Sequence, residues 1–497
     1  MTAQIALKAG DGAAISAADV EASAPMAAAI ASSSADAARK EAEWGAREAA
    51  KGPASGRQDA ASGGATAAAR KGSTTGEDAS LKRQGFMAFA IRVASAGLAY
   101  VSQVFFARVL GIDGYGIFSV GWTLVLVLGH VAPLGVAESA VRFLPRYHLR
   151  GQRALARGFI AMGREVSLIG GAAFAAIGAV VLLLMPMGDI CWPILGLLAC
   201  IMPFAYQDWL EGVARGLDRP GLALACPYLL RPVLVGLALA AAAFLGHPTA
   251  ASAMLAAFLA TLVTATIQSV LVRRAVRQEI GEGPSRDASR AWLRASAPLA
   301  GGIACDQVSA YADVLALGLL ASPAEAAIYI AASKTLTLAN FAQYALGVVA
   351  GRRFAAAKAR GGGGALTQLA AASTRLTLVA SLAAIGFVLV AGVPLLALFG
   401  KDFGGAYPVL AALCVGVLAR AACGQKEAIL TMLGYWKGLF LISFATLVVA
   451  LIADFGLTFL YGVMGAAAAC AIVATFRSAA VILLARRALA PAGRTAP

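Results

Sequence analysis

Residues 109–150 read VLGIDGYGIFSVGWTLVLVLGHVAPLGVAESAVRFLPRYHLR, and the pattern of this stretch decides the fold class. After a glycine-rich turn, the chain from Gly116 to Ala137 contains no Lys, Arg, Asp or Glu. A helical crossing of a bilayer needs about 20 predominantly apolar residues, so this run is long enough for one. The run is followed by three regularly spaced arginines, Arg142, Arg146 and Arg150. Because Lys and Arg gather on the cytoplasmic side of membrane proteins, the stretch predicts one membrane crossing together with its orientation.

The composition of the whole chain agrees with that prediction. Of the 497 residues, 60% are hydrophobic and 13% are charged, whereas soluble domains have about 45–50% apolar and about 25% charged residues. The net charge is +15, and residues 1–80 contribute eight basic and ten acidic residues to it. The positive excess therefore lies in short loops between apolar runs, where orientation and anionic lipid explain it. We expect membrane lipids, and no nucleic acid, as partners.

The chain divides into a polar tail and two sets of apolar runs. Residues 1–80 are rich in Ala, Ser, Gly and charge and have no signal-peptide pattern, which predicts a disordered cytoplasmic tail. The runs that follow form two sets of six, separated by a basic loop. The predicted parts are the tail 1–80, a six-helix bundle 81–280, a basic cytoplasmic linker 281–296, a second six-helix bundle 297–487 and a cytoplasmic tail 488–497.

We predict twelve transmembrane helices. They cover residues 85–110, 116–139, 166–187, 190–212, two spans between 232 and 272, 297–320, 324–350, 369–399, 407–434, 439–459 and 462–484. Every other loop is rich in Arg, as in residues 141–157, so the positive-inside rule places both termini in the cytoplasm. We expect the multi-pass chain to lie in the inner (plasma) membrane. The predicted fold is all-α, with two pseudo-symmetric bundles and the substrate path between them, as in transporters.

Charged and amide side chains inside the predicted spans mark candidate sites, because an ionisable group at the bilayer centre costs about 2.5–3.5 kcal/mol on insertion scales. The candidates for substrate binding in a central cavity are Arg92, Gln103, Arg231, Lys334, Asn340, Arg375 and Arg477. The acidic candidates for ion coupling are Asp306 and Asp313. Together they predict a cavity of net positive charge, which suits a phosphate or diphosphate group.

These residues also have less specific interpretations, which the sequence leaves open. Arg92, Arg375 and Arg477 lie near cytoplasmic ends of spans, where long side chains can reach lipid headgroups. The aspartates can form simple ion pairs with Lys334 or Arg92. Lys334 is near the middle of its span, where neither end is within easy reach.

The sequence lacks the motifs of the common enzyme and metal sites. It has no GxxxxGK[ST], HExxH or GxSxG pattern, and none of its seven cysteines forms a CxxC pair. We therefore expect a protein that is not an enzyme, holds no metal site and uses no cofactor apart from a coupling proton or sodium ion.

Several motifs, in order along the chain, resemble a known family. They are FFARVLGIDGYGIF at 105–118, LGVA at 134–137, RFLP at 142–145, LFGKDFGGAY at 398–407 and YGVMGAA at 461–467. Across about residues 85–487 the chain resembles the polysaccharide-exporter branch of the multidrug/oligosaccharidyl-lipid/polysaccharide (MOP) flippase superfamily. This resemblance implies a MATE-like fold, a cationic lumen and alternating access between two lobes.

The function that the resemblance implies is a flippase for undecaprenyl-diphosphate-linked oligosaccharides in exopolysaccharide, O-antigen or capsule biosynthesis. A polysaccharide polymerase and chain-length complex is then the expected protein partner. The main alternative is a cation-coupled multidrug or metabolite antiporter of the same fold, although a cationic cavity argues against organic cations. A peptidoglycan-precursor flippase would carry extra spans, and a membrane-embedded polymerase would carry a long loop or an intramembrane His.

Overall fold

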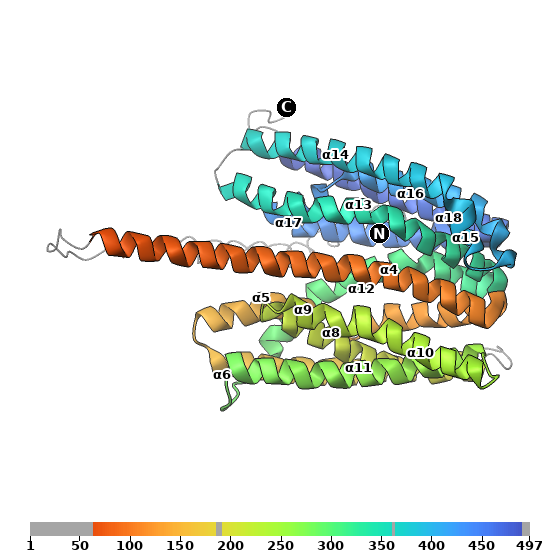
Figure 1. Ribbon diagram of the computed structural model, residues 1–497, viewed down its shortest axis with the longest axis horizontal. Helices are drawn as coiled ribbons and strands as arrows, with labels where there is room; N and C mark the ends of the chain where they lie inside the picture. Colours follow the sequence, from red (N-terminus) through yellow and green to blue (C-terminus); the bar gives the residue numbers. More distant parts are fainter. Residues whose placement is uncertain (1–62, 185–190, 360–362, 490–497) are drawn as a thin grey trace, which may run out of the picture. The chain divides into compact units, whose positions relative to one another are not determined.

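The computed structural model describes residues 63–184, 191–359 and 363–489, and all of its regular elements in these ranges are helices (Figure 1). The chain divides into two compact units, Met1–Asp78 and Ala79–Pro497, and the second unit holds the features discussed below. The elements are α4 (Gly63–Val131), α5 (Val136–Leu149), α6 (Arg153–Leu184), α7 (Cys191–Leu198), α8 (Ile201–Gly216), α9 (Pro220–Ala225), the π-helix η2 (Cys226–Leu230), α10 (Arg231–Phe244), α11 (Ala250–Glu279), α12 (Ser289–Leu320), α13 (Pro323–Ala359), α14 (Gly363–Val390), α15 (Gly392–Ala397), the 3-10 helix η3 (Lys401–Gly405), α16 (Ala406–Cys423), α17 (Lys426–Leu433) and α18 (Trp436–Leu489).

Eight stretches of the described residues are helical, long and apolar enough to cross a membrane. Two of the helices, α4 and α18, each consist of two helices joined at a non-helical glycine, Gly111 (φ 71°) and Gly462 (φ 57°). Glycine has no Cβ and adopts positive φ at little cost, so these positions allow the chain to turn between two apolar segments. The prediction of an all-helical, multi-pass membrane protein is confirmed.

The second half of α4 ends earlier than the predicted span 116–139. The helix stops at Val131, a turn follows, and α5 begins at Val136. Proline cannot donate a backbone hydrogen bond, and both Leu134 and Gly135 have positive φ, so the helix cannot continue through this turn. Arg142, Arg146 and Arg150 therefore lie on or directly after a helix, where the sequence predicted a loop.

Two further boundaries differ from those predicted. Helix α12 begins at Ser289, so the second part of the predicted linker 281–296 is helical. The Asp287 carboxylate accepts hydrogen bonds from the backbone N–H (2.9 Å) and the hydroxyl of Ser289, which also lower the pKa of Asp287. Helix α4 begins at Gly63 within the predicted tail 1–80, because its Ala-rich start favours a helix. The rest of that tail, and most of 488–497, lie outside the described residues.

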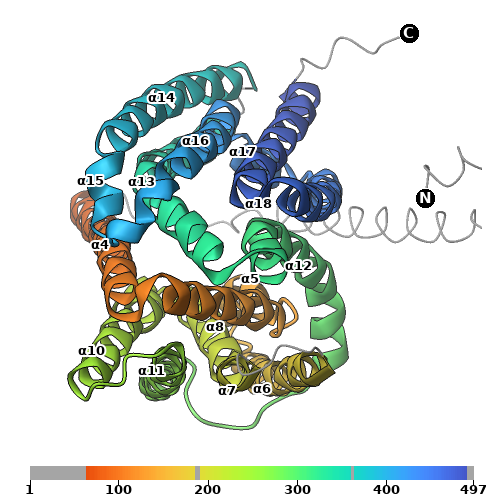
Figure 2. The same cartoon turned by 90° about the vertical axis from the view of Figure 1, so that its right-hand side faces the viewer.

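The helices of the second unit form two groups, which we call the first group (α4 from Ala79 onward, through α11) and the second group (α12–α18). Figure 2 shows α6, α8, α10 and α11 on one side, α13–α18 on the other, and α4 running between them. The largest buried cluster joins the groups and includes Tyr115 and Phe118 of α4, Tyr329 of α13 and Phe399. Polar side chains in this contact region are therefore held by helices from both groups.

Candidate functional site

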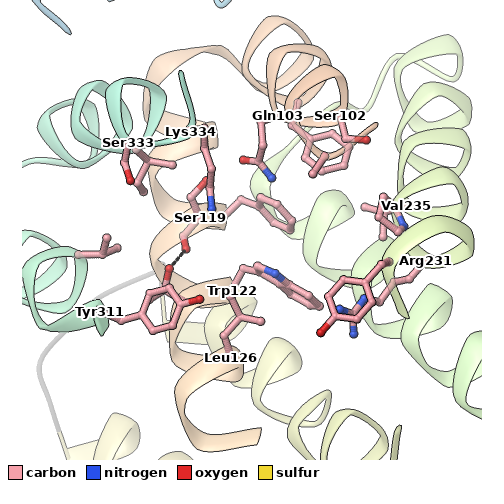
Figure 3. A pocket seen from close by; sticks show the side chains of 18 of the residues that line it. Ser102, Gln103, Ser119, Trp122, Leu126, Arg231, Val235, Tyr311, Ser333 and Lys334 are labelled. Atoms are coloured by element: carbon pink, nitrogen blue, oxygen red, sulfur yellow. Dashed lines mark hydrogen bonds between the residues drawn. The ribbon is translucent and has the colours of Figure 1, made fainter. Parts of the chain in front are cut away.

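A cavity of about 340 Å³ lies between the two groups and is lined by α4, η2, α10, α12 and α13 (Figure 3). Both halves of α4 contribute to its wall. Ser95, Ala99 and Gln103 follow one another at helical spacing on the first half, and Ser119 and Trp122 lie on the second. The turn at Gly111 thus brings two polar faces of a single helix element to one cavity.

Gln103, one of the predicted residues, is fixed by a neighbour across the turn of α4. Its side-chain oxygen accepts a hydrogen bond of 2.8 Å from the hydroxyl of the buried Tyr115. This bond uses the oxygen and leaves the amide N–H₂ group as donor, so Gln103 can offer hydrogen bonds to a ligand in the cavity.

Arg231 provides one cation of the cavity wall. It stands at the junction of the π-helix η2 and α10, and such π segments are frequent at functional sites. Its guanidinium donates a hydrogen bond to Gln207 (3.2 Å) and lies over the rings of Trp122 and Phe204, at 5.3 and 4.9 Å from their centroids. Among the described residues no carboxylate lies within ion-pair distance of it. Arg231 is thus held in place by an amide and aromatic faces, and its charge is not neutralised by a contact.

Lys334 of α13 provides the second cation, from the opposite wall (Figure 3). Its ammonium group makes no hydrogen bond or ion pair with the described residues, and it interacts electrostatically with Asp313 of α12. The Asp313 carboxylate is occupied by other donors, the Tyr329 hydroxyl and the backbone N–H of Val314 (2.7 Å). The cavity therefore combines two cations with one carboxylate whose hydrogen bonds are made to other groups.

The other predicted residues lie elsewhere. Arg477 of α18 forms ion pairs with Asp306 of α12 (2.8 Å) and Glu427 of α17 (2.7 Å), and none of the three lines the cavity. Arg375 is exposed on α14, and the side-chain oxygen of Asn340 is buried without a hydrogen-bond partner. Arg92 lies on α4, and its side chain is outside the described residues. The structure thus brings Gln103, Arg231, Lys334 and Asp313 together and separates the others from them.

Sequence reasoning missed a group of charged residues on the first group of helices. Arg215 of α8 contacts Glu138 of α5 (2.9 Å) and Glu211 (3.7 Å), and His130 lies 3.9 Å from Asp208. Asp208 and Glu211 fall inside the predicted span 190–212, so the rule that selected Asp306 also applied to them.

A further acidic residue that the sequence prediction overlooked lies on α18. Asp454 is 2% exposed, and one of its carboxylate oxygens has no hydrogen-bond partner. Because Asp454 lies inside the predicted span 439–459, the criterion that selected Asp306 and Asp313 would also have selected it.

Comparisons with known proteins agree with this architecture. A family model described as "Polysaccharide biosynthesis protein" matches residues 81–351. No curated protein matches the chain. An inward-facing multidrug resistance MATE family transporter of the MOP superfamily is similar with a TM-score of 0.64 at 14% identity, covering 82% of this chain and 98% of that one.

Two further solved structures show the same fold. An outward-facing MATE family transporter has a TM-score of 0.60 at 15% identity, over 82% of this chain and 94% of that one. A MOP superfamily transporter from Pyrococcus furiosus, described by the reverse polarity of its binding pocket, has a TM-score of 0.57 at 14% identity, over 83% and 95%.

The family follows from the extent of these matches. The family model spans more than half of the 497 residues, and the solved structures share the fold over nearly their whole length. The solved structures are those of membrane transporters. The chain therefore belongs to the polysaccharide biosynthesis protein family, and it has the fold of MATE transporters of the MOP superfamily.

Proposed function

We propose that this protein is a flippase that moves an undecaprenyl-diphosphate-linked oligosaccharide from the cytoplasmic to the periplasmic leaflet of the inner membrane. The product would supply exopolysaccharide, O-antigen or capsule synthesis. The observation that carries this proposal is the pair of cations, Arg231 and Lys334, on opposite walls of the central cavity without a contacting carboxylate. Two such cations favour a ligand group with more than one negative charge, and a diphosphate offers several acceptor oxygens to both.

The remaining wall of the cavity suits the neighbouring sugar. Ser102 and Gln103 contribute a hydroxyl and an amide group, and Trp122 contributes an aromatic face. Sugars need hydrogen-bond partners for their hydroxyls, and orienting polar groups in a mostly apolar pocket are typical of small-ligand sites. Because the cavity measures about 340 Å³, we propose that it holds the diphosphate with adjacent sugar, and that the rest of the oligosaccharide requires a wider state of the transport cycle.

We propose that coupling to a proton or sodium ion uses Asp313, which lines the cavity close to Lys334. Protonation of its carboxylate would remove the negative charge facing Lys334 and change the cavity's affinity for an anion. Asp306 is a weaker candidate, since it is paired with Arg477. With both termini in the cytoplasm, as the arginine-rich loops favour, a polysaccharide polymerase complex would receive the product on the periplasmic side.

The experiment is a deletion strain complemented with variants of the gene. We expect surface polysaccharide to fall and lipid-linked oligosaccharide to accumulate on the cytoplasmic side in the deletion strain, and both to recover with the wild-type chain. The variant Arg231→Gln should fail to complement at equal membrane abundance. Unchanged polysaccharide together with altered drug sensitivity would instead favour the multidrug antiporter and would overturn the proposal.

A further inference from the structure

A second cavity, of about 280 Å³, lies inside the first group of helices, between α6, α8 and α11. It shares no lining residue with the central cavity. Each helix contributes one face to it, as shown by the spacing of Arg157, Ala161 and Arg164 on α6 and of Arg273 and Arg277 on α11. The cavity is thus a separate feature of the fold, and the proposed transport path does not explain it.

The floor of this cavity is apolar and rigid. Trp209 of α8 is 1% exposed and packs edge-on against Phe159, with ring centroids 5.6 Å apart. A Cβ on Gly163 of α6 would lie 2.4 Å from the indole ring, so this glycine is what allows Trp209 to lie against α6. The neighbouring Tyr206 is fixed by a hydrogen bond of 2.8 Å to Ser269. Such a floor can pack against the apolar or glycerol portion of a ligand.

Four arginines surround this floor, and they are not equivalent. Arg157 is occupied, because its guanidinium donates hydrogen bonds to backbone oxygens of the segment that follows α11, including that of Pro284 at 2.9 Å. Arg277 forms an exposed ion pair with Glu282 at 3.2 Å. Arg164 and Arg273 make no hydrogen bond or ion pair with the described residues, although they line the same cavity. Two guanidinium groups that line one cavity, without a carboxylate partner among the described residues, favour a bound anion.

The position of these two arginines along their helices matches the headgroup level of a bilayer. On α6, residues 166–184, which follow Arg164 and Glu165, carry no charge, and on α11 residues 250–272 before Arg273 carry none. At 1.5 Å per residue these uncharged stretches span about 28 Å and about 34 Å, close to the hydrocarbon thickness of a membrane. Both arginines therefore lie where the apolar stretch ends and the lipid phosphates begin, on the arginine-rich side assigned to the cytoplasm.

We propose that this cavity binds the phosphate-bearing headgroup of an anionic phospholipid from the cytoplasmic leaflet. Arg164 and Arg273 hold the phosphate from opposite sides, and the Trp209 floor packs against the glycerol and the first carbons of the acyl chains. Basic pockets between membrane helices are suited to such headgroups, and guanidinium groups bind phosphate oxygens in a bidentate manner. This inference does not depend on the transported substrate.

The experiment measures the thermal unfolding temperature of the purified full-length protein in a neutral detergent as phosphatidylglycerol is added. A ligand that binds only the folded state raises this temperature in a concentration-dependent way. We expect phosphatidylglycerol to do so and phosphatidylcholine not to. The double variant Arg164→Gln/Arg273→Gln should need at least about tenfold more phosphatidylglycerol for the same shift, as expected for the loss of charge-assisted hydrogen bonds.

The matched control is Arg274→Gln/Arg290→Gln. Like the test variant, it removes two positive charges, but from exposed residues outside the cavity, one near the end of α11 and one at the start of α12. It should retain the wild-type response. The variant Ala161→Phe keeps every charge and fills the cavity, and it should also lose the response. If it does not fold, the conservative Arg164→Lys/Arg273→Lys variant replaces it, and a response intermediate between wild type and the glutamine pair is expected.

Three results would overturn the proposal. An equal loss in the control variant would show a diffuse attraction to charge. An equal stabilisation by inorganic phosphate or glycerophosphate would show a site for free anions, without a role for the lipid. Stabilisation by a polyprenyl diphosphate but not by phosphatidylglycerol would assign the site to the diphosphate of a transported lipid. A response to phosphatidylglycerol that requires Arg164 and Arg273 supports it.

Discussion

At the scale of single residues, Lys334 is the side chain for which the structure most clearly favours a role in ligand binding over a role in folding. It is a cation on a cavity wall, between two groups of helices, and no described residue pairs with it. A lysine in this position has its donors available, and removing a charged hydrogen-bonding group from a ligand site costs about 1.5–3 kcal/mol. Its contribution is therefore expected to appear in transport, with little effect on folding.

We predict that Lys334→Ala lowers the export of lipid-linked oligosaccharide by at least about tenfold, while Lys334→Arg keeps a substantial part of it. The measurement is surface polysaccharide per cell, normalised to the amount of protein in the membrane. Arg375→Gln is the matched control, since Arg375 is exposed and outside the cavity. Wild-type export by the alanine variant would exclude Lys334 from substrate binding.

Arg477 is expected to act on stability, because it ties three helices together through Asp306 and Glu427. Its side chain is 29% exposed and that of Asp306 is 48% exposed, so the pair is worth about 1 kcal/mol or less. We predict that Arg477→Gln and Asp306→Asn each lower the unfolding temperature in detergent. The double variant should unfold at the same temperature as the less stable of the two single variants. Additive effects of the two substitutions would show that the contact contributes nothing.

The sequence identified these residues but not their grouping. Arg231, Lys334 and Arg477 look alike in the sequence, since each is a basic residue in an apolar span. Whether such a side chain meets a cavity or a carboxylate depends on how each helix is rotated against its neighbours, and tertiary packing decides that rotation. The partners of Arg477 lie 50 and 171 positions away in the chain, so no local pattern could reveal them.

At the scale of elements, glycines set where the helices turn and how closely they approach. The turns at Gly111 and Gly462 fall where the sequence predicted breaks between spans. The break before α5 was not predicted, because Pro and Gly also occur inside membrane helices. The turn also packs closely against α12, since a Cβ on Gly135 would lie 2.7 Å from the backbone nitrogen of Ala300. Hydrophobic length alone therefore predicts the spans better than their ends.

The close approach of α4 to α13 at Gly116 can be tested by substitution. A Cβ at this position would lie 1.9 Å from the backbone oxygen of Pro323, and a backbone atom cannot move aside as the end of a flexible side chain can. We predict that Gly116→Ala costs about 1–3 kcal/mol, as overpacking does, and lowers the unfolding temperature by several degrees. Gly97→Ala on the same helix is the control, because its Cβ would meet nothing within 4 Å. Equal behaviour of the two variants would contradict the close approach.

At the scale of the whole second unit, two contacts join the two groups of helices, one through α4 and one through α5. Near the turn at Gly111, between the two cavity-lining halves of α4, Arg108 donates hydrogen bonds to the backbone oxygens of Leu398 (2.6 Å) and Ala397 (2.9 Å). Beyond the end of α4, the buried hydroxyls of Ser139 on α5 and Ser296 on α12 lie 2.7 Å apart. A transporter that opens to each side in turn has to break one of these contacts at a time while the groups move as rigid bodies.

The contact between Ser139 of α5 and Ser296 of α12 gives the most direct test of that motion. Cysteines at both positions should form a disulfide on mild oxidation, because the two oxygens are 2.7 Å apart. We predict that Ser139→Cys/Ser296→Cys exports oligosaccharide when reduced, stops when oxidised and recovers on reduction. Each single variant should stay active under the same oxidant, which controls for the seven native cysteines. Undiminished export by the cross-linked protein would show that the groups do not separate at this end, and transport would then have to proceed by opening beside Arg108 alone.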